Sequence, residues 1–194
     1  DVYKRQLQDF FIIIYWWLIL LGLGFLFLPL TTKLFTCFWD KGWVLSKILG
    51  IVVISYLVFL TGRLHLLPFF KETIFLIILL ILGGNIWWLS QEKRKKELKQ
   101  VFREKWRFFL LEEIIFFLTL VFWSFIRGFQ PDIEGLEKFM DFGFVNSILR
   151  SAWFPPKDIW FAGEPINYYY FGHLQAAVLT KLSGLDSAIT YNLM

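Results

Sequence analysis

The sequence is poor in cysteine, histidine and charge. It has one cysteine, Cys37, and two histidines in 194 residues. A single cysteine excludes a disulfide within the chain and any metal cluster held by several thiolates. Only 19% of the residues are charged, whereas about a quarter is usual in soluble domains. This composition excludes a disordered chain and a coiled coil, and it argues against most soluble enzymes.

Apolar and aromatic residues fill the sequence instead. It is 57% hydrophobic and 21% aromatic, with a mean hydropathy of +0.57. A membrane-spanning helix needs about 20 apolar residues, and tryptophans gather at the ends of the apolar runs, as in an aromatic belt. The predicted spans are Phe10–Leu30, Trp43–Leu60, Thr73–Leu89, Phe108–Ile126 and Asn167–Leu182, with a sixth beginning at Leu185. We therefore predict an all-α, polytopic bundle of membrane helices.

The predicted organisation follows from these runs. Residues 1–6 have the look of a translated sequencing-library end, and we expect them to be an artefact. Residues 7–126 contain four spans, residues 127–166 an external segment, and residues 167–194 a fifth span and the start of a sixth. Because the last apolar segment has only begun where the sequence stops, we expect a fragment of a longer, prokaryotic protein.

A strongly basic segment, residues 91–107, sets the predicted orientation. It holds eight basic and three acidic residues, so its net charge of +5 exceeds the +4 of the whole chain. Short basic loops stay in the cytoplasm, where anionic lipid headgroups attract them. The spans on both sides argue against binding to nucleic acid. We expect a multi-pass protein of the cell membrane, with residues 91–107 cytoplasmic and residues 127–166 extracytoplasmic.

The external segment has the pattern of an amphipathic helix that starts near Glu134. Its apolar residues recur every three or four positions and are Ile133, Leu136, Met140, Phe144 and Ile148. Glu134, Glu137 and Asp141 share a second face. We expect the helix to lie on the outer membrane surface, with the acidic face toward a cavity. A solvated polar face without chemistry fits the same pattern.

A proline-rich stretch and three consecutive tyrosines follow. The prolines exclude a helix over residues 154–165, and Asn167 is a candidate N-cap for the fifth span. The tyrosines of residues 168–170 point in different directions around a helix, so at least one should face the interior. His173, one turn inside the span, is a structural residue, a cavity residue or a metal ligand. No second histidine stands at the spacing of a zinc site.

Two glutamates, Glu112 and Glu113, begin the fourth span. They lie one to two turns from its cytoplasmic end, where they can extend to the interface toward Arg107 or Lys105. A buried glutamate in a proton relay is the alternative.

The external segment carries a longer and more specific pattern. It combines EKFMDF at 137–142, Asn146, ILRS at 148–151, FPP at 154–156, Asp158, WFAG at 160–163 and NYYYFG at 167–172. The pattern resembles the bacterial and archaeal YYY family of membrane proteins, which is named for its triple tyrosine and described as a domain of unknown function. The similarity is densest over residues 127–193. Phe139 departs from it, because a proline is expected there.

The YYY family in turn resembles the GT-C class of membrane glycosyltransferases, which carry acids on a surface helix of the first large external loop. This resemblance implies a polyprenyl-phosphate sugar donor among the membrane lipids. It makes Glu137 the first candidate and Asp141 the second for the base that takes the proton of an acceptor hydroxyl. The implied substrate-binding residues are Arg127, Arg150, Lys157, Asp158, Trp160, Asn167, Tyr168, Tyr169, Tyr170 and His173. No cofactor is certain. A divalent cation on Glu137, Asp141 and Asp158 stays open, although the spacing does not indicate it.

Two other functions remain open. A transporter or flippase would usually place its ionisable residues at mid-membrane, in broken helices. The best break signal, residues 83–85, lies near a cytoplasmic end, and the acids gather in the external segment. A non-catalytic membrane scaffold does not need three acids on one helix face beside a dense aromatic block. The sequence therefore favours the glycosyltransferase.

Overall fold

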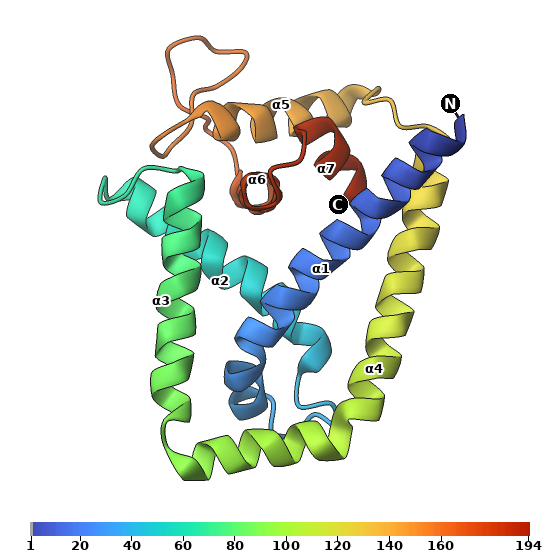
Figure 1. Cartoon of the computed structure of the whole chain (residues 1–194). Coiled ribbons are helices and arrows are strands. Elements are labelled where there is room, and N and C mark those ends of the chain that lie inside the picture. The colour runs from blue at the N-terminus through green and yellow to red at the C-terminus, as the bar shows by residue number, and fades with distance from the viewer. Residues whose placement is uncertain (1) are drawn as a thin grey trace. The chain divides into compact units, whose positions relative to one another are not determined.

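The structure is a computed structural model that describes residues 2–194, with side chains described for residues 8–135 and 137–194. The helices are α1 (Val2–Leu34), α2 (Trp43–Arg63), α3 (Lys71–Leu89), α4 (Glu92–Gly128), α5 (Leu136–Arg150), α6 (Phe171–Ser183) and α7 (Ser187–Leu193) (Figure 1). Residues 2–194 contain no β-strand beyond an isolated bridge between Lys157 and Pro165. The predicted artefact at residues 1–6 lies outside the described side chains.

Four helices are long and apolar enough to cross a membrane. The stretches are Gln8–Leu34, Trp43–Arg63, Lys71–Leu89 and Glu92–Gly128. At most 33% of the residues in the most apolar window of each are buried within the protein, and large apolar side chains such as Leu79, Trp87 and Phe125 stay exposed. Such surfaces suit lipid tails. The prediction of an all-α membrane protein with several spans is confirmed.

The chain forms two compact units. The first contains the residues up to Gly50 and Leu79–Ile126. The second contains Ile51–Ile78 and Arg127–Met194. The residues that the sequence predicts for the functional site all belong to the second unit.

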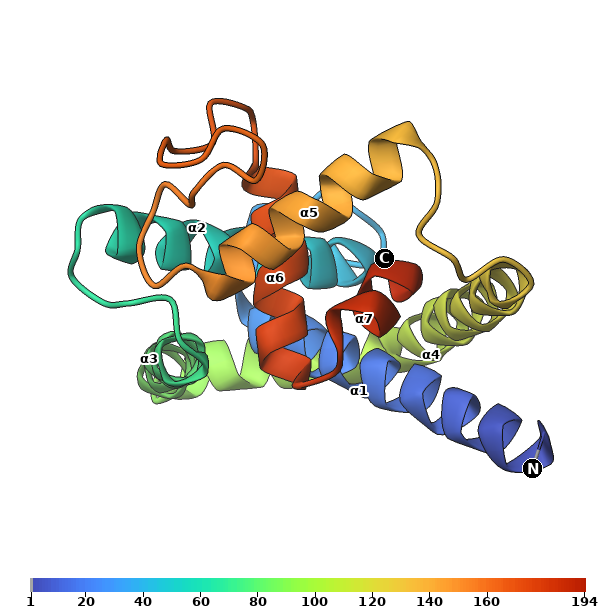
Figure 2. The same cartoon turned by 90° about the horizontal axis from the view of Figure 1, so that it is seen from above.

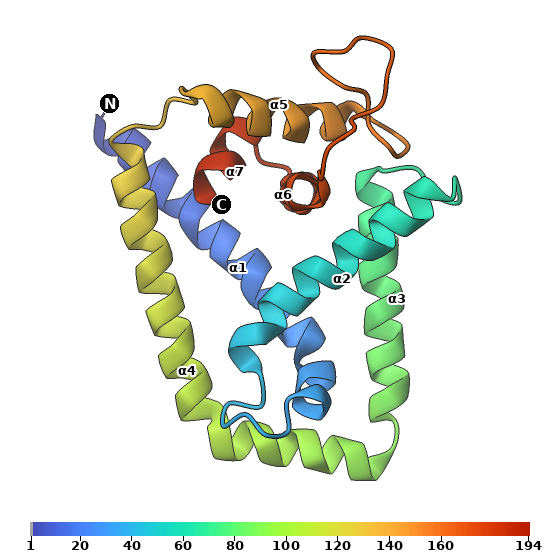
Figure 3. The same cartoon turned by 180° about the vertical axis from the view of Figure 1, so that it is seen from behind.

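In the first unit, residues 92–107 of the basic segment, which the sequence predicted as a loop, are helical. They form the first arm of α4, which bends and then continues as the apolar span (Figure 3). Its Lys, Arg, Glu and Gln residues favour helix, and Gln100 donates to Glu104 one turn later (2.8 Å). Leu98 and Val101 of this arm, together with Leu21, pack against a core of Leu28, Trp43 and Phe109.

The loop between α1 and α2 contacts α4 in this unit. The ring of Trp39, from the loop between α1 and α2, lies edge-on to Phe108, with 3.6 Å between the ring centroids. The ammonium of Lys105 lies 4.1 Å from the centroid of Trp39. The loop after α1 and the basic arm of α4 therefore lie side by side. Their cytoplasmic location stays a prediction.

The first unit also buries an ion pair among three spans. Nζ of Lys47 on α2 lies 2.6 Å from Oε2 of Glu113 on α4, and both side chains are less than a tenth exposed. The indole N–H of Trp17 on α1 donates to the other oxygen of Glu113 (2.7 Å). The expected extension of Glu113 toward Arg107 or Lys105 is therefore wrong. Its carboxylate turns inward, where burial demands a cation and a hydrogen bond.

In the second unit, α5 packs against α6 and α7 (Figure 2). Phe144, Val145 and Ile148 on α5 and Leu174 and Ala177 on α6 are buried. Phe144 and Ile148 belong to the predicted apolar stripe, whose Leu136 side chain lies outside the described part. The amphipathic helix is thus present, and the C-terminal part of its stripe packs within the protein.

Helix α6 differs from the predicted fifth span. It begins at Phe171 and has 13 residues, a length of about 20 Å at the rise of an α-helix, which is shorter than the bilayer core. Its N-cap is Tyr170, not Asn167, and Gly184 ends it in the left-handed conformation at φ 71°, which glycine adopts without steric cost. Membrane crossing by this segment stays a prediction.

Candidate functional site

A cavity of about 580 Å³ lies in the second unit beside α5 and α6. It is lined by Arg127, Lys138, Asp141, Val145, Tyr169, Gly172, His173, Ala176, Tyr191 and Met194, and we call it the Asp141 cavity. Lys138, Asp141 and Val145 are three and four residues apart and so share one face of α5. His173 and Ala176 share a face of α6 for the same reason. The helical period thus brings polar residues from two segments to one hollow.

An acid and a histidine meet in this cavity. Nε2 of His173 lies 3.0 Å from Oδ1 of Asp141. A carboxylate only accepts hydrogen bonds, so the imidazole donates. The rings of Phe144 and His173 are in edge-on contact, with 5.4 Å between their centroids. This contact holds the imidazole in place. Oδ2 of Asp141 has no hydrogen-bond partner among the described residues, so it can accept one from a ligand.

Two cations line the same cavity. Arg127 donates from Nη1 to the carbonyl of Gln130 (2.8 Å), and its guanidinium keeps further donors for a ligand. Within the described part of the chain, Lys138 has no carboxylate within 4.0 Å. The cavity therefore offers positive charge for an anionic group beside a carboxylate that can accept a proton.

The first two residues of the tyrosine triplet form a stacked pair. Their ring centroids are 4.0 Å apart with an interplanar angle of 28°, and the hydroxyl of Tyr168 donates to that of Tyr169 (2.6 Å). This hydrogen bond is the main cause that raises the pKa of Tyr168, and the carboxylates of Asp141 and Glu137 add to it. Tyr169 lines the cavity and leaves most of its ring exposed. The pair presents a flat aromatic surface at the cavity edge.

The third tyrosine contributes to an aromatic groove of about 380 Å³. Its lining consists of Tyr56, Phe59, Tyr168, Tyr169, Tyr170 and Phe171. Phe59 on α2 lies 6.3 Å from both Tyr170 and Phe171, measured between ring centroids. Tyr168 and Tyr169 line this groove, and Tyr169 also lines the Asp141 cavity. The triplet therefore joins an apolar surface to a polar one.

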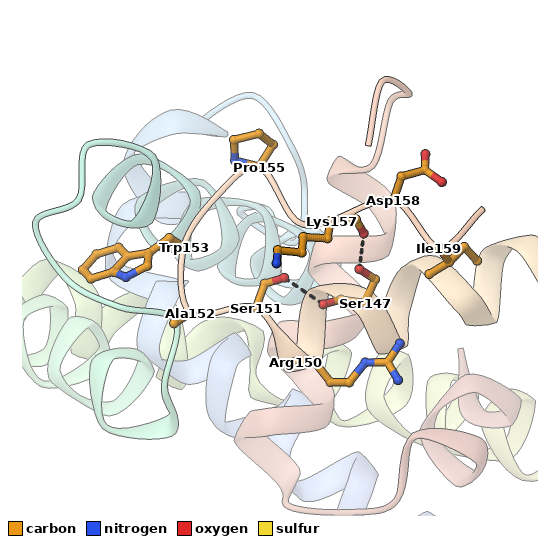
Figure 4. Close-up of a pocket in the computed structure, with 9 residues that line it drawn as sticks. All are labelled: Ser147, Arg150, Ser151, Ala152, Trp153, Pro155, Lys157, Asp158 and Ile159. Atoms are coloured by element: carbon orange, nitrogen blue, oxygen red, sulfur yellow. Dashed lines mark hydrogen bonds between the residues drawn. The ribbon is translucent and has the colours of Figure 1, made fainter. Parts of the chain in front are cut away.

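A second cavity, of about 640 Å³, lies where α5 ends (Figure 4). It is lined by Ser147, Arg150, Ser151, Ala152, Trp153, Pro155, Lys157, Asp158 and Ile159, and we call it the Lys157 cavity. The hydroxyl of Ser147 donates to the backbone carbonyl of Lys157, and the hydroxyl of Ser151 donates to the backbone carbonyl of Ser147 (2.9 Å). These bonds tie the proline-rich loop to the last turn of α5.

Asp158 is held by its own loop. Its Oδ1 accepts from the backbone N–H groups of Trp160 (2.8 Å) and Phe161 (3.0 Å). Hydrogen bonds from the backbone of Phe161 and then of Trp160 lower the pKa of the Asp158 carboxyl. A carboxylate with two backbone donors stabilises a tight turn, so Asp158 has a structural role in this loop.

Residues 53–194 match the DUF2298 family of uncharacterized membrane proteins. The chain belongs to this family. The matched residues include every residue that lines the Asp141 cavity, the Lys157 cavity or the aromatic groove. No curated protein and no solved structure matches the chain.

The structure distributes the predicted site residues of this DUF2298 protein over separate places. The Asp141 cavity takes Arg127, Asp141, Tyr169 and His173, and the Lys157 cavity takes Arg150, Lys157 and Asp158. Tyr168 and Tyr170 line the aromatic groove. Glu137, Trp160 and Asn167 are exposed. Trp160 packs edge-on against Phe144, with 5.8 Å between ring centroids.

Two polar residues of the cavity, Lys138 and Tyr191, were not among the predicted site residues. Lys138 follows the acid Glu137, and Tyr191 comes from the last described helix. The helical spacing of Lys138 from Asp141 was the available signal. Among the residues that the structure describes, no three His, Cys, Asp or Glu side chains gather as metal ligands. Glu137, Asp141 and Asp158 therefore do not form the metal site left open by the sequence.

Proposed function

We propose that this protein transfers a sugar from a polyprenyl-phosphate donor to an acceptor hydroxyl on the extracytoplasmic face of the membrane. The observation that carries the proposal is the Asp141–His173 pair, which lines one cavity with Arg127 and Lys138. Glycosyl transfer needs these groups together, because a proton must be accepted while an anionic leaving group departs. The YYY and GT-C resemblance points to the same reaction class.

The reaction assigns a task to each polar group of the cavity. The acceptor oxygen forms a bond to the anomeric carbon, and the bond from that carbon to the phosphate oxygen breaks. The phosphate leaves with the electron pair. Oδ2 of Asp141 takes the acceptor proton, while the hydrogen bond from His173 to Oδ1 fixes the carboxylate in position. Arg127 and Lys138 hold the departing polyprenyl phosphate.

Aromatic residues supply the rest of the proposed binding site. The exposed ring face of Tyr169 stacks on the sugar, because an aromatic ring offers a large apolar surface with a polar hydroxyl at its tip. The aromatic groove with Tyr56 and Phe59 receives the start of the isoprenoid chain. Because Tyr169 lines both places, one donor can reach from the groove into the cavity.

Sugar transfer measured on variants tests the proposal and separates the two candidate bases. The purified protein is mixed with a panel of polyprenyl-phosphate hexoses and membrane extract as acceptor source. Asp141→Asn should lower transfer by about 10² to 10⁴-fold, the usual contribution of a general base. Glu164→Gln is the control, because it removes an exposed acid that lines neither cavity.

Glu137→Gln gives the second comparison. Glu137 is exposed and lines neither cavity, so we expect a smaller loss than for Asp141→Asn. Complete loss with Glu137→Gln and normal transfer with Asp141→Asn would assign the base to Glu137. Normal transfer by both variants would contradict a carboxylate base on α5.

A transporter or flippase is the second candidate, because the spans contain the buried ion pair of Lys47 and Glu113. Ionisable residues inside spans often mark transport pathways. Each of these charges already has its partner, which fits a structural role better than a moving ion. A transporter would move the lipid-linked sugar without breaking its bond to phosphate, so intact donor after incubation would favour this alternative. A scaffold should retain no polyprenyl phosphate on purification.

A further inference from the structure

An apolar groove of about 620 Å³ lies in the first unit, lined by α1, α3 and the basic arm of α4. Each helix contributes residues at positions i, i+3, i+4 and i+7, which share one helix face. These stripes run from Gly22 to Pro29, from Leu82 to Leu89 and from Lys95 to Phe102, and we call the hollow the Lys99 groove. It shares no lining residue with the Asp141 cavity, so a ligand here does not depend on the proposed glycosyl transfer.

The walls of the Lys99 groove are held apart by fixed contacts. A Cβ on Gly22 would meet no atom within 4 Å, so the absent side chain leaves this part of the groove open. Nδ2 of Asn85 donates to the backbone carbonyl of Leu26 (2.6 Å), which ties α3 to α1. On the arm of α4, Leu98 packs against the core of the unit. The groove is therefore a built feature of the three helices.

The lining of the groove is mostly apolar and open to the surroundings. The side chains of Phe25, Leu82, Ile86 and Phe102 are each at least 43% exposed. The volume falls within the range of about 300–1,000 Å³ that is usual for small-molecule sites. Apolar surface is unfavourable in water, and on membrane helices it lies against lipid chains. The chemistry of the lining therefore fits an acyl chain.

The arm of α4 adds two cations to this apolar lining. Lys95 and Lys99 are one helical turn apart, which places their Cβ atoms about 5–6 Å from each other on the groove side of the arm. Within residues 8–135 and 137–194, Lys99 has no carboxylate within 4.0 Å, and Lys95 has only an exposed contact of 3.9 Å with Glu92. Such an exposed pair contributes little, so both ammonium groups stay available to an anion.

Trp88 places the start of the arm at the depth of the lipid headgroups. It lies at the end of α3, next to which the arm begins (Figure 1). Nζ of Lys33 and Cζ of Arg94 lie 4.4 and 5.2 Å from the centroid of its ring, and Nη1 of Arg94 donates to its backbone carbonyl (3.4 Å). Tryptophan is enriched at the membrane–water interface. The groove therefore reaches from lipid-facing helix surfaces to the level of the phosphates.

We infer that the Lys99 groove binds an anionic phospholipid, with an acyl chain along α1 and α3 and the headgroup phosphate between Lys95 and Lys99. Charge complementarity selects this occupant, because the segment that carries both lysines has a net charge of +5 and basic segments at a membrane attract anionic headgroups. A zwitterionic lipid would bring its own cation next to the two lysines. A second copy of the chain would bring an identical basic arm, and like charges repel.

Native mass spectrometry with defined lipids tests this site. The purified protein in dodecyl maltoside is titrated with dioleoyl phosphatidylglycerol or with dioleoyl phosphatidylcholine, which has the same chains. One phosphatidylglycerol should bind about tenfold or more tightly than phosphatidylcholine, because each lysine near an anionic headgroup contributes about fivefold. Lys99→Gln should weaken phosphatidylglycerol binding about fivefold and leave phosphatidylcholine binding unchanged. Lys96→Gln removes an exposed cation of the same arm that does not line the groove, and it should bind both lipids as the native protein does.

A second pair of variants tests the place of the acyl chain. Gly22→Leu puts a side chain into the groove and should abolish tight binding of both lipids. Gly83→Leu is the control, because its Cβ also meets nothing within 4 Å and Gly83 does not line the groove. Leucine favours helix more than glycine does, so both variants should fold, which circular dichroism checks.

Four results would overturn the inference. Equal affinity of the native protein for the two lipids would exclude an anionic ligand. Equal losses in Lys96→Gln and Lys99→Gln would indicate a diffuse basic surface instead of a site. Unchanged binding by Gly22→Leu would place the acyl chain elsewhere, and a lipid-free dimer of the native protein would assign the groove to a second copy of the chain.

Discussion

Replacing Lys47 with methionine should strongly destabilise the first unit. The Lys47 ammonium lies 2.6 Å from the Glu113 carboxylate, and the two side chains are 8% and 9% exposed. Removing one partner of such a pair leaves the other charge buried alone, at a cost of about 3–5 kcal/mol. That cost lowers the folding equilibrium constant by roughly 10² to 10⁴.

The double variant separates a lost attraction from an uncompensated charge. In Lys47→Met with Glu113→Gln, no charge remains buried, and the glutamine oxygen still accepts from the indole of Trp17. We expect this protein to lie within about 1–2 kcal/mol of the native one, because a buried pair contributes little net stability over neutral residues. The two substitutions should therefore be strongly non-additive.

Unfolding by sodium dodecyl sulfate in mixed micelles provides the free energies. Lys95→Met is the control, since Lys95 pairs with Glu92 at 3.9 Å on an exposed surface and such pairs contribute at most about 1 kcal/mol. The reasoning fails if Lys47→Met is no worse than Lys95→Met, or if the double variant loses the sum of the two single losses.

Three other predictions concern the second unit. Gly62→Ala should cost about 1–3 kcal/mol of unfolding free energy, because its Cβ would lie 2.5 Å from the Phe154 ring; Gly83→Ala, which meets nothing within 4 Å, should cost nothing. The lowered pKa of Asp158 means that its turn is fully stabilised above about pH 4, the ordinary carboxyl range, and loses this contribution as the pH falls through the lowered pKa. Hydrogen-exchange protection of residues 158–164 should fall accordingly, and Asp158→Asn should lower it at neutral pH. Tyr169→Ala should raise the KM for the lipid-linked sugar about three- to tenfold, and Tyr169→Phe should not.

The spans could be predicted from the sequence because their signal is local. A run of about 20 apolar residues has few alternatives to a membrane helix, and the first four runs appear as helices. The helix α5 carries an equally local signal in its three- and four-residue spacing. By contrast, the length of α6 depends on Tyr170 and Gly184 at its ends, and an apolar count does not report such end effects.

Pairs between distant residues escaped the sequence. Lys47 and Glu113 are 66 positions apart, and Asp141 and His173 are 32 apart. Each residue alone fits several roles: Glu113 near a span end resembles an interfacial residue, and His173 resembles a packing residue. Only the packing of the helices selects the partner. For the same reason, the sequence could not separate Arg127 from Arg150 and Lys157, which line different cavities.

Photo-crosslinking of the donor tests the proposed function most directly. A polyprenyl-phosphate sugar with a diazirine next to its phosphate is bound to the purified protein, irradiated, and mapped by mass spectrometry. The proposal predicts labelled peptides from α5 and α6 around Lys138, Asp141 and His173, with labelling suppressed by unmodified donor. Labelling confined to residues 8–50 and 79–126, or no labelling that unmodified donor suppresses, would contradict a lipid-linked sugar in the Asp141 cavity.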